Sequence, residues 1–200
     1  MPTAAPRPGR RERHKQDKLD RITAAARELF TEFGVDDVTT QQIADKADIG
    51  TGTLFLYART KAELLLLVQN SAYADALVRG TAAAERAADT LDAVMAILRP
   101  VVECNRVQVD NGRTYLREIV FGDPEEPHHR DALGYTIETE KAVAGVLQRR
   151  EGLDPDAAAT LAHVVSAVMF VTLAVTANAA KGVEELLAEI TAQLRAILPG

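Results

Sequence analysis

Two hundred residues, 47% of them hydrophobic and 26% charged, can bury a core in one large or two small domains, which excludes wholesale disorder. The net charge of −6 is weak evidence against a nucleic-acid partner, and the single cysteine, Cys104, excludes an intramolecular disulfide framework and indicates a reducing cytoplasm. No uninterrupted apolar run reaches the roughly 18 residues that cross a bilayer, and no apolar segment follows the basic N-terminus, so we expect neither a membrane helix nor a secretory signal.

The distribution of charge along the chain, unlike the net charge, favours a nucleic-acid partner. Residues 1–61 hold 11 Lys and Arg against 9 Asp and Glu, whereas residues 62–200 hold 12 against 20. Such asymmetry predicts an end that faces phosphate and a body that phosphate avoids. Abundant Ala, Leu and Val and the absence of Trp favour helices over sheets, so we expect an all-α fold.

The chain opens with a basic segment and a helix. Residues 1–17 are rich in Pro, Arg and Gly without apolar periodicity, which predicts a flexible arm, either a solvated tail or an extra contact to DNA. From Lys18 to Phe33 the apolar residues recur at helical spacing, and Gly34 then provides a left-handed stop. This scaffolding helix is expected to pack beneath the next segment through Leu29, Phe30 and Phe33.

Residues 39–61 predict a helix-turn-helix, a motif that lays its second helix in the major groove of DNA. Thr39 and Gln42 stand three residues apart, as in a capping box, so the first helix is expected from Thr39 to about Ala47. The buried side of this helix should consist of Ile43, Ala44 and Ala47.

A tight turn and a second short helix follow. Asp48 occupies a turn position that needs a left-handed backbone, which Asp tolerates better than most residues. Gly50 can serve as the N-cap of the second helix, although less well than Ser would. That helix is expected from Thr51 to about Tyr57, with Leu54 buried.

A resemblance to a known family is carried by the run ITAAARELFTEFGVDDVTTQQIADKADIGTGTLFLYARTKAELL. This run resembles the DNA-binding domain of the tetracycline-repressor (TetR) family of bacterial regulators, because many landmarks fall at the family's spacing. These landmarks are Ala25, Ala26, Leu29, Phe30, Gly34, Thr39, Ile43, Ala44, Ala47, Ile49, Gly52, Thr53, Leu54, Tyr57, Lys61, Ala62, Glu63 and Leu64. The chain departs from the family pattern at Asp48 (usually Gly), Phe55 (usually Tyr) and Ala58 (usually aromatic).

The resemblance implies a division of the chain and a function. Residues 1–17 would be the basic arm, residues 18–65 the helix-turn-helix DNA-binding domain, and residues 66–200 a helical effector-binding and dimerisation domain. The chain would be a cytoplasmic, ligand-responsive transcriptional regulator, chiefly a repressor that a small molecule releases from a palindromic operator. It would not be an enzyme, and we expect no cofactor and no metal.

Within this motif, Thr51 and Thr53 are expected to meet base edges, because a threonine offers both a hydroxyl and a methyl group. Gly52 allows close approach of the backbone, and Gln41 is expected to reach a base or a phosphate. Thr40, Tyr57 and Lys61 are expected to hold phosphates, since a helix N-terminus beside a lysine is a phosphate site. The predicted DNA-binding residues are Thr39, Thr40, Gln41, Gly50, Thr51, Gly52, Thr53, Tyr57 and Lys61.

The acidic remainder of the chain predicts only helices. A long helix begins through Arg59 and Lys61 and runs to about Arg79, before a polar break. Later breaks are expected at Asn111-Gly112, Gly122–Pro124, Gly152–Pro155 and Gly182, which leaves helices at about 89–108, 112–121, 127–150, 155–180 and 183–198.

The last two helices predict dimerisation. Residues 155–180 are apolar nearly all round, so that helix must be buried on more than one side, and residues 183–198 carry a single apolar stripe. In the TetR family the corresponding pair forms a four-helix bundle across a two-fold axis, and a homodimer is what two half-sites about one DNA turn (~34 Å) apart require. The alternative is an ordinary core helix of a monomer.

The middle helices are expected to hold the effector pocket. Its candidate lining residues are bulky or carry a polar tip, and they are Met95, Leu98, Val102, Tyr115, Ile119, Phe121, Tyr135 and Phe170. Cys104 is interpreted as structural, and His163 as a satisfied core histidine or a pocket donor.

Two further interpretations stay open at this point. An all-helical enzyme or metal-binding protein with a helix-turn-helix-like brace is supported only by the acidic loop around Asp123, Glu125, Glu126, His128 and His129. Adjacent histidines do not share a helical face as zinc ligands usually do, so we interpret that segment as a solvated loop. An activator of the same fold is the other alternative.

Overall fold

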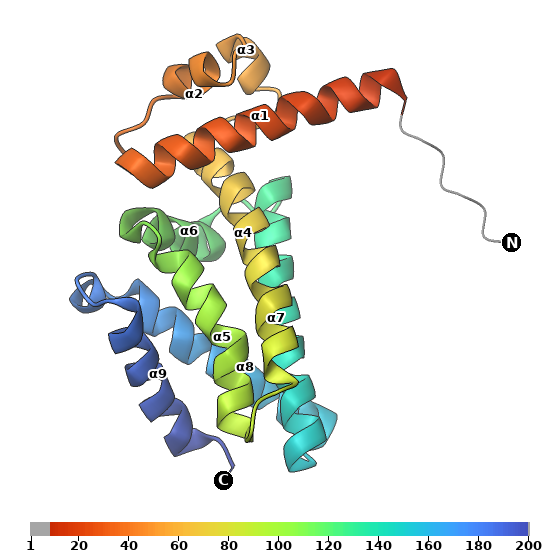
Figure 1. The fold of residues 1–200 in the computed structure, drawn as a ribbon, viewed down its shortest axis with the longest axis vertical. Helices are drawn as coiled ribbons and strands as arrows, with labels where there is room; N and C mark the ends of the chain where they lie inside the picture. Colours follow the sequence, from red (N-terminus) through yellow and green to blue (C-terminus); the bar gives the residue numbers. More distant parts are fainter. Residues whose placement is uncertain (1–8, 200) are drawn as a thin grey trace, which may run out of the picture. The chain divides into compact units, whose positions relative to one another are not determined.

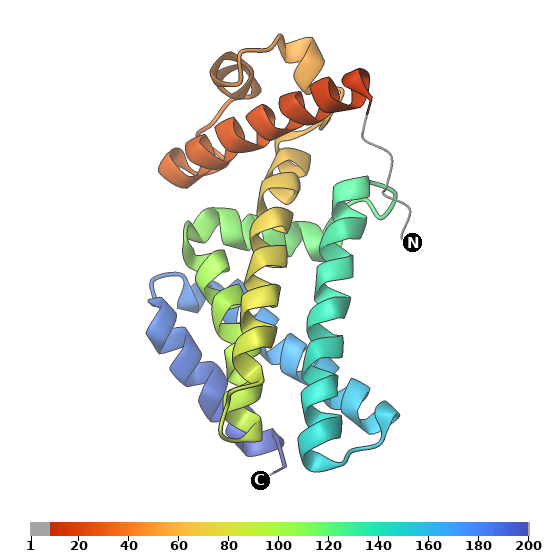
Figure 2. The same cartoon turned by 45° about the vertical axis from the view of Figure 1, so that its right-hand side comes forward.

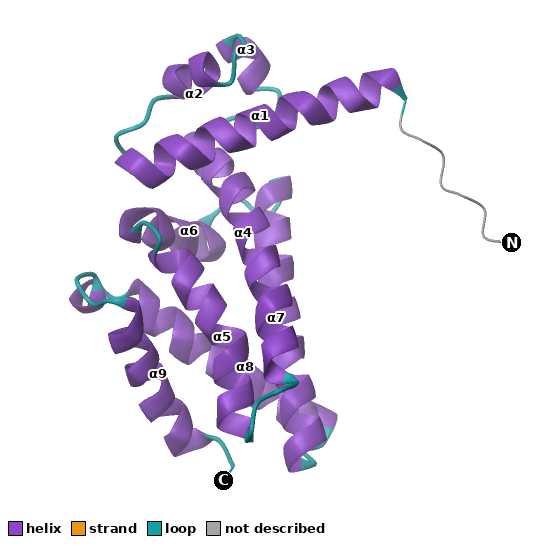
Figure 3. Ribbon diagram, viewed as in Figure 1, coloured by secondary structure: helices purple, strands orange, loops and turns teal. Residues whose placement is uncertain are grey.

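In the computed structural model, which describes residues 9–199, every regular element is a helix (Figures 1 and 3). The expected all-α fold is therefore confirmed. The chain divides into two compact units, Met1–Val68 and Gln69–Gly200, and each contains its own cluster of buried apolar residues.

The first unit contains α1 (Arg10–Phe33), α2 (Thr40–Lys46), α3 (Thr51–Leu54) and the beginning of α4 (Lys61–Ala84). Helices α2 and α3 lie along one side of α1 (Figure 1). Their shared core consists of fully buried residues that include Ile22, Ala26, Phe30, Ile43, Ala44, Leu54, Leu64 and Leu65. The predicted burial of the inward side of α2 and of Leu54 in α3 is confirmed.

Helix α1 begins at Arg10 rather than at Lys18, so the expected arm is wrong for residues 10–17, while residues 1–8 lie outside the described part of the chain. Residues 10–18 contain no Pro or Gly and consist mainly of Arg, Glu, Lys and Gln, which are good helix formers. The carbonyl of Gly9 accepts the first helical hydrogen bond from Arg13 N at 3.1 Å. A solvent-facing helical extension needs no apolar stripe, and the sequence pattern therefore did not reveal it.

The turn chemistry of the motif is confirmed. Thr39 Oγ1 accepts a hydrogen bond from Gln42 N at 3.2 Å, and Gln42 Oε1 accepts one from Thr39 N at 2.8 Å, which is the predicted capping box. Asp48 has a φ of 53°, the left-handed conformation expected at this position, and it is the only described residue other than glycine with a positive φ.

The expected burial of Phe33 is wrong, because its side chain is 50% exposed. Phe33 is the last residue of α1, and the chain reverses at Gly34, which has a φ of 79°. The segment after that turn contributes Val35 and Val38 to the core, and both are almost fully buried. The buried cluster of this unit therefore contains these two valines and not Phe33.

The second unit continues α4 and adds α5 (Thr90–Arg106), α6 (Val109–Phe121), α7 (Pro127–Glu151), α8 (Pro155–Ala174), the 3₁₀ turn η1 (Thr176–Asn178) and α9 (Val183–Ile197). Helices α5, α7, α8 and α9 pack in a ring, α7 against α8, α8 against α9, α9 against α5 and α5 against α7. Helix α6 lies across one end of this ring, in contact with α5, α7 and α8 (Figure 2).

Most predicted breaks in this unit are confirmed, and two are wrong. Gly152 ends α7 in the left-handed conformation, and Asp154 caps α8 with Pro155 in its first turn. The expected break after Arg79 lies later, because α4 continues to Ala84. Gly112 lies inside α6 instead of preceding it, since Gln108 supplies the cap by accepting from Asn111 N at 2.7 Å.

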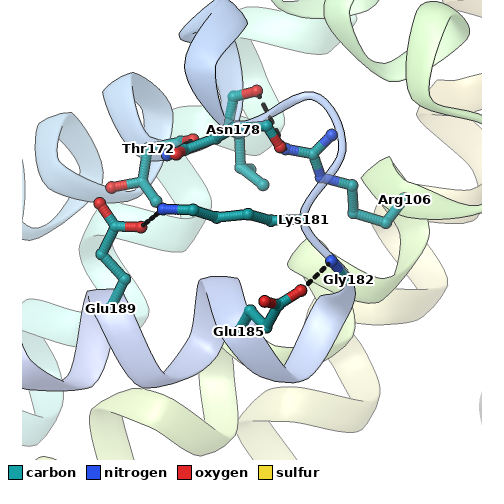
Figure 4. A network of polar contacts seen from close by, with 8 residues as sticks. Arg106, Thr172, Asn178, Lys181, Gly182, Glu185 and Glu189 are labelled. Atoms are coloured by element: carbon teal, nitrogen blue, oxygen red, sulfur yellow. Dashed lines mark hydrogen bonds and ion pairs between the residues drawn. The ribbon is translucent and has the colours of Figure 1, made fainter.

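Helix α8 ends at Ala174, earlier than expected, because side chains hold the following turn η1 in place (Figure 4). Asn178 is buried and donates from Nδ2 to the Thr172 carbonyl at 2.9 Å. Arg106 Nη2 donates to the carbonyls of Leu173 and Asn178, both at 3.4 Å. These bonds satisfy carbonyls that a helix end leaves without intrahelical partners.

Helix α8 is long and apolar enough to cross a membrane by length and composition, so the expectation of no such helix is wrong by that criterion. A core helix of a soluble protein passes the same test, which makes this weak evidence. Val165 and Leu173 are buried in the ring, whereas Val164 and Val171 on the same helix are exposed. Helix α8 therefore carries apolar residues on both a buried face and an exposed face.

Candidate nucleic-acid interface and ligand cavity

The turn between α2 and α3 brings two predicted DNA-binding residues, Gln41 and Thr51, into contact. Thr51 Oγ1, at the start of α3, donates to Gln41 Oε1 at 2.7 Å, and Gln41 Nε2 donates to Asp45 Oδ1 at 2.7 Å. Gln41 therefore links the two helices of the motif through its amide. Gly50 and Gly52 are exposed, and a Cβ at either position would meet no protein atom within 4 Å, so that face of α3 is unobstructed.

Other predicted contacts are already engaged inside the unit. The hydroxyl of Thr39 serves the capping box, and Thr40, the first residue of α2, is half-buried. Tyr57, just beyond α3, donates its hydroxyl to the Lys15 carbonyl at 3.3 Å. Lys61 Nζ donates to the carbonyls of Val35 and Asp36, at 2.8 and 3.0 Å. Thr53 is half-buried on the same helix as Thr51.

The N-terminal extension of α1 supplies basic residues that the sequence reading assigned to an arm. A hollow next to Tyr57 is lined by Arg11, Glu12, His14, Lys15 and Lys18. The sequence feature that indicates this helical extension is the lack of any helix breaker between Arg10 and Lys18. Phe55 and Leu56 are also exposed directly after α3, Leu56 by 83%. Apolar side chains in this position can meet thymine methyl groups, and we predicted neither.

The second unit contains a cavity of about 310 Å³ whose walls come mainly from α6, α7 and α8. Four of the predicted pocket residues line it, namely Tyr115, Ile119, Tyr135 and Phe170. The other four do not. Leu98 and Val102 are fully buried in the ring core, and Met95 packs against that core. Phe121 is 82% exposed at the end of α6.

One wall of the cavity contains two stacked tyrosines, Tyr73 from α4 and Tyr115 from α6, with ring centroids 4.7 Å apart. Asn105 Nδ2 donates to the Tyr73 hydroxyl at 3.1 Å, and the Tyr115 hydroxyl donates to Asn70 Oδ1 at 2.8 Å. Asn70 Nδ2 in turn donates to the His128 carbonyl at 2.8 Å. Burial raises the pKa of both tyrosines well above the usual value, so both remain neutral phenols near pH 7.

The lining residues include a histidine and a glutamate in hydrogen-bond contact. His163 Nδ1 lies 2.9 Å from Glu140 Oε1, and their side chains are 76% and 25% exposed. The interpretation of His163 as a core histidine is therefore wrong, because its side chain is largely exposed, whereas the alternative of a pocket donor agrees with its place in the lining. Deeper in the protein, the Oγ atom of Ser166 is buried and has no hydrogen-bond partner among the described residues.

The acidic segment before α7 is more ordered than a solvated loop. Glu126 is buried and caps α7 by accepting from His128 N and His129 N at 2.9 and 2.6 Å. His129 is buried as well, so the expected solvated loop is wrong for these two residues. Within residues 9–199 no group of three or more His, Cys, Asp or Glu side chains is arranged to hold a metal ion. The acidic segment was the one feature that favoured a metal-binding protein, and one of its carboxylates, Glu126, serves as the cap of α7.

Residues 22–68 match the family model described as bacterial regulatory proteins, tetR family. No curated protein matches the chain. Among solved structures, FadR from Thermus thermophilus, a TetR-family repressor in complex with lauroyl-CoA, is 22% identical with a TM-score of 0.70, covering 90% of this chain and 93% of that one. A TetR regulator from Rhodococcus sp. RHA1 is 17% identical with a TM-score of 0.67, over 92% and 97%. FadR from Bacillus subtilis, in complex with stearoyl-CoA, is 17% identical with a TM-score of 0.62, over 90% and 98%.

Proposed function

We propose that this chain is a repressor that a small molecule releases from a palindromic operator, from the premise that residues 22–68 match the family model of the tetR bacterial regulatory proteins. The observation that carries the proposal is a complete helix-turn-helix, with its capping box and left-handed Asp48, inside the residues that match the family. Two structures of similar fold hold an acyl-CoA, which supports a ligand-responsive second unit.

Residues of α3 and of its surroundings divide into base readers and phosphate holders. Thr51 and Thr53 read base edges, with Thr51 oriented by its hydrogen bond to Gln41. The unobstructed backbone at Gly50 and Gly52 allows DNA to approach α3 closely. Thr40, Tyr57 and Lys61 hold phosphates and set the register without reading sequence. The basic residues at the start of α1 extend this phosphate contact beside Tyr57.

The operator is read by a homodimer that forms through α8 and α9. Val164 and Val171 on α8 are exposed by 40% and 58%, two helical turns apart on one face. On α9, Ala188, Ala192 and Ala196 form an exposed stripe of small residues at a spacing of four. Large exposed aliphatic residues on one helix beside small ones on the next suit close packing against a second copy of the same pair.

Release from DNA follows from linkage between the cavity and the operator. A ligand must bind the DNA-incompetent state better than the competent one, and DNA then weakens ligand binding by the same factor. Helix α4 contributes residues to both units, Lys61 to the first and Tyr73 to the second, and Tyr73 lines the cavity. Ligand contact with Tyr73 therefore acts on the helix whose first residue is the phosphate-holding lysine.

Selection of bound fragments from a random DNA library tests the proposal. A dimeric reader enriches a palindrome whose half-sites are about one helical turn (~34 Å) apart. Enrichment of sequence without two-fold symmetry would contradict the dimeric reader, and no enrichment at all would contradict sequence-specific binding. Placing the selected operator upstream of, or overlapping, a promoter in a transcription assay then distinguishes repression from activation.

A further inference from the structure

We infer that the cavity binds a compact, mainly apolar molecule with a cationic nitrogen, which pairs with the carboxylate of Glu140. The inference rests on the proposed role of this cavity as the effector site, because it names the chemical class of that effector. It separates this protein from the two structural neighbours that hold acyl-CoA.

The size and walls of the cavity define the apolar part of the ligand. A volume of about 310 Å³ lies at the lower end of the range of about 300–1,000 Å³ that ligand pockets span. The walls are aromatic and aliphatic, with rings from Tyr73, Tyr115, Tyr135 and Phe170. Such walls accept one or two rings or a short branched chain by excluding water from them. Aromatic faces also attract a cation.

Most polar atoms in the walls already have partners. The hydroxyls of Tyr73 and Tyr115 bond to Asn105 and Asn70. Thr136 and Thr139 donate their hydroxyls to carbonyls of their own helix, at 3.3 and 2.8 Å. These groups give the wall its shape and offer little hydrogen bonding to a ligand.

Of the polar groups that remain, the hydroxyls of Ser166 and Tyr135 can donate or accept, whereas Glu140 favours a donor on the ligand. Glu140 is a carboxylate that accepts hydrogen bonds, and its present partner, His163, lies largely in solvent. Ser166 is more than nine-tenths buried, and its Oγ atom has no partner among the described residues, which leaves one buried polar atom for the ligand to satisfy. A ligand ammonium can replace the imidazole of His163 at Glu140, while its apolar part fills the interior.

The charge of the lining disfavours an anionic head group. Among the described residues that line the cavity, none is a lysine or an arginine, and the acidic Glu140 is one of them. A carboxylate or phosphate would meet the like charge of Glu140, which costs binding free energy. Among the described lining residues, the basic side chain is His163, and it is already paired with Glu140. Acyl-CoA carries several phosphate charges, so we expect it to be a poor ligand here.

Isothermal titration of the full chain with three matched probes tests the charge preference. The probes are 4-phenylbutylamine, 4-phenylbutanol and 5-phenylpentanoate, which share a phenyl ring with four methylene groups and differ in the charge of the head. We expect the amine to bind about tenfold more tightly than the alcohol, and the acid most weakly. Equal or tighter binding of the acid or of lauroyl-CoA, or no saturable binding of the amine at millimolar concentration, would overturn the inference.

Variants locate the preference on Glu140. Glu140→Gln should abolish the advantage of the amine over the alcohol, whereas Glu138→Gln, on the same helix but paired with Lys141, should retain it. Ser166→Ala should weaken all three probes by a similar factor. An amine preference that survives Glu140→Gln overturns the assignment.

The effector role is measured separately by release of the selected operator in a gel-shift assay. Release by lauroyl-CoA without amine binding would refute the ligand class and leave the regulator intact. Amine binding through Glu140 without any effect on DNA would support the ligand class and refute the effector role of the cavity.

Discussion

At the scale of single residues, Lys61 combines a structural contact within the first unit with the contact to a DNA phosphate that we propose. Its Nζ donates to the carbonyls of Val35 and Asp36, which fastens the turn after α1 to the start of α4. Three donors are available on the ammonium, so one remains for a DNA phosphate. The same residue can therefore stabilise the fold and contribute to DNA affinity.

Lys61→Ala should lower the free energy of unfolding by about 1 kcal/mol, because two hydrogen bonds to a charged donor are lost at a partly exposed site. It should also weaken binding to every DNA sequence and reduce the salt dependence by about one unit of slope. Urea unfolding measures the first effect, and fluorescence anisotropy at several salt concentrations measures the second. A loss of stability with an unchanged salt slope would show that Lys61 serves only the turn.

The burial of Tyr73 and Tyr115 makes the free energy of unfolding depend on pH in the alkaline range. Burial raises the pKa of each phenol above that of tyrosine in the unfolded chain, about 10. The folded protein then keeps protons that the unfolded chain releases, so the free energy of unfolding falls as the pH rises above about 10. In Tyr73→Phe and Tyr115→Phe, spectrophotometric titration should lose one late-ionising phenol each. A phenol that titrates near pH 10 in the folded wild type at either position would contradict its burial.

At the scale of elements, glycine sets how closely two pairs of helices approach. A Cβ on Gly112 of α6 would overlap the carbonyl oxygen of Asn105 on α5, and a Cβ on Gly80 of α4 would lie 2.7 Å from the Ile97 carbonyl oxygen. This close approach also fixes the side chain of Asn105, because its Nδ2 donates to the Gly112 carbonyl at 3.2 Å. The approach of α5 and α6 thus positions the amide that bonds to Tyr73 in the cavity wall.

Gly112→Ala should lower the free energy of unfolding by about 2 kcal/mol or more, because backbone atoms must move apart to admit a methyl group. Gly134→Ala is the matched control, because it is also a helical glycine and its Cβ would meet no protein atom within 4 Å. That control should raise the free energy of unfolding by about 0.5–1 kcal/mol through helix propensity. Thermal unfolding of both variants measures the difference, and equal effects would contradict the close approach.

The elements that sequence patterns predict well are those with specific local chemistry. The capping box at Thr39, the left-handed turn at Asp48 and the stop at Gly152 depend only on neighbouring residues, and all three are confirmed. The start of α1 could not be predicted in this way, because an exposed helical segment has no regular spacing of apolar residues. Gly112 was read as a break because its tertiary role, close approach to Asn105, leaves no local signal.

The candidate cavity shows the same limit. Bulky residues in the middle helices were expected to line it, and Leu98 and Tyr115 look equally suitable in the sequence. The structure places Leu98 in the core of the ring and Tyr115 in the cavity wall. Which face of a helix borders a cavity depends on the packing of its neighbours, and periodicity alone cannot supply that. Ser166 was missed for the same reason.

At the scale of the whole molecule, the proposed dimer accounts for the membrane-like composition of α8, because it gives the exposed apolar face of that helix a partner. A helix with one face in the ring and another against a partner is apolar on both, as α8 is. The proposed dimer also relates two copies of α3 by a two-fold axis, which the reading of a palindrome requires. Recognition of a palindrome thus depends on dimerisation. A substitution on α8, far from α3 in the sequence, should therefore affect both.

Val164→Glu should convert the proposed dimer to a monomer, because it places a charge in the apolar face of α8 that the partner would cover. Val164 is 40% exposed and does not line the cavity, so the charge does not disturb the ligand site directly. Val78→Glu on α4, where the valine is 71% exposed, is the matched control and should remain dimeric. Sedimentation velocity measures the state of assembly, and circular dichroism checks that both variants keep their helices.

The same pair of variants links assembly to operator binding. A monomer holds one half-site and loses the second set of contacts, so Val164→Glu should lose at least about 100-fold in affinity for the palindrome while its affinity for an isolated half-site stays unchanged. Val78→Glu should match the wild type on both DNAs. If Val164→Glu remained a dimer, or if a monomeric variant bound the palindrome as tightly as the wild type, the interface would lie elsewhere or the operator would be read by single chains.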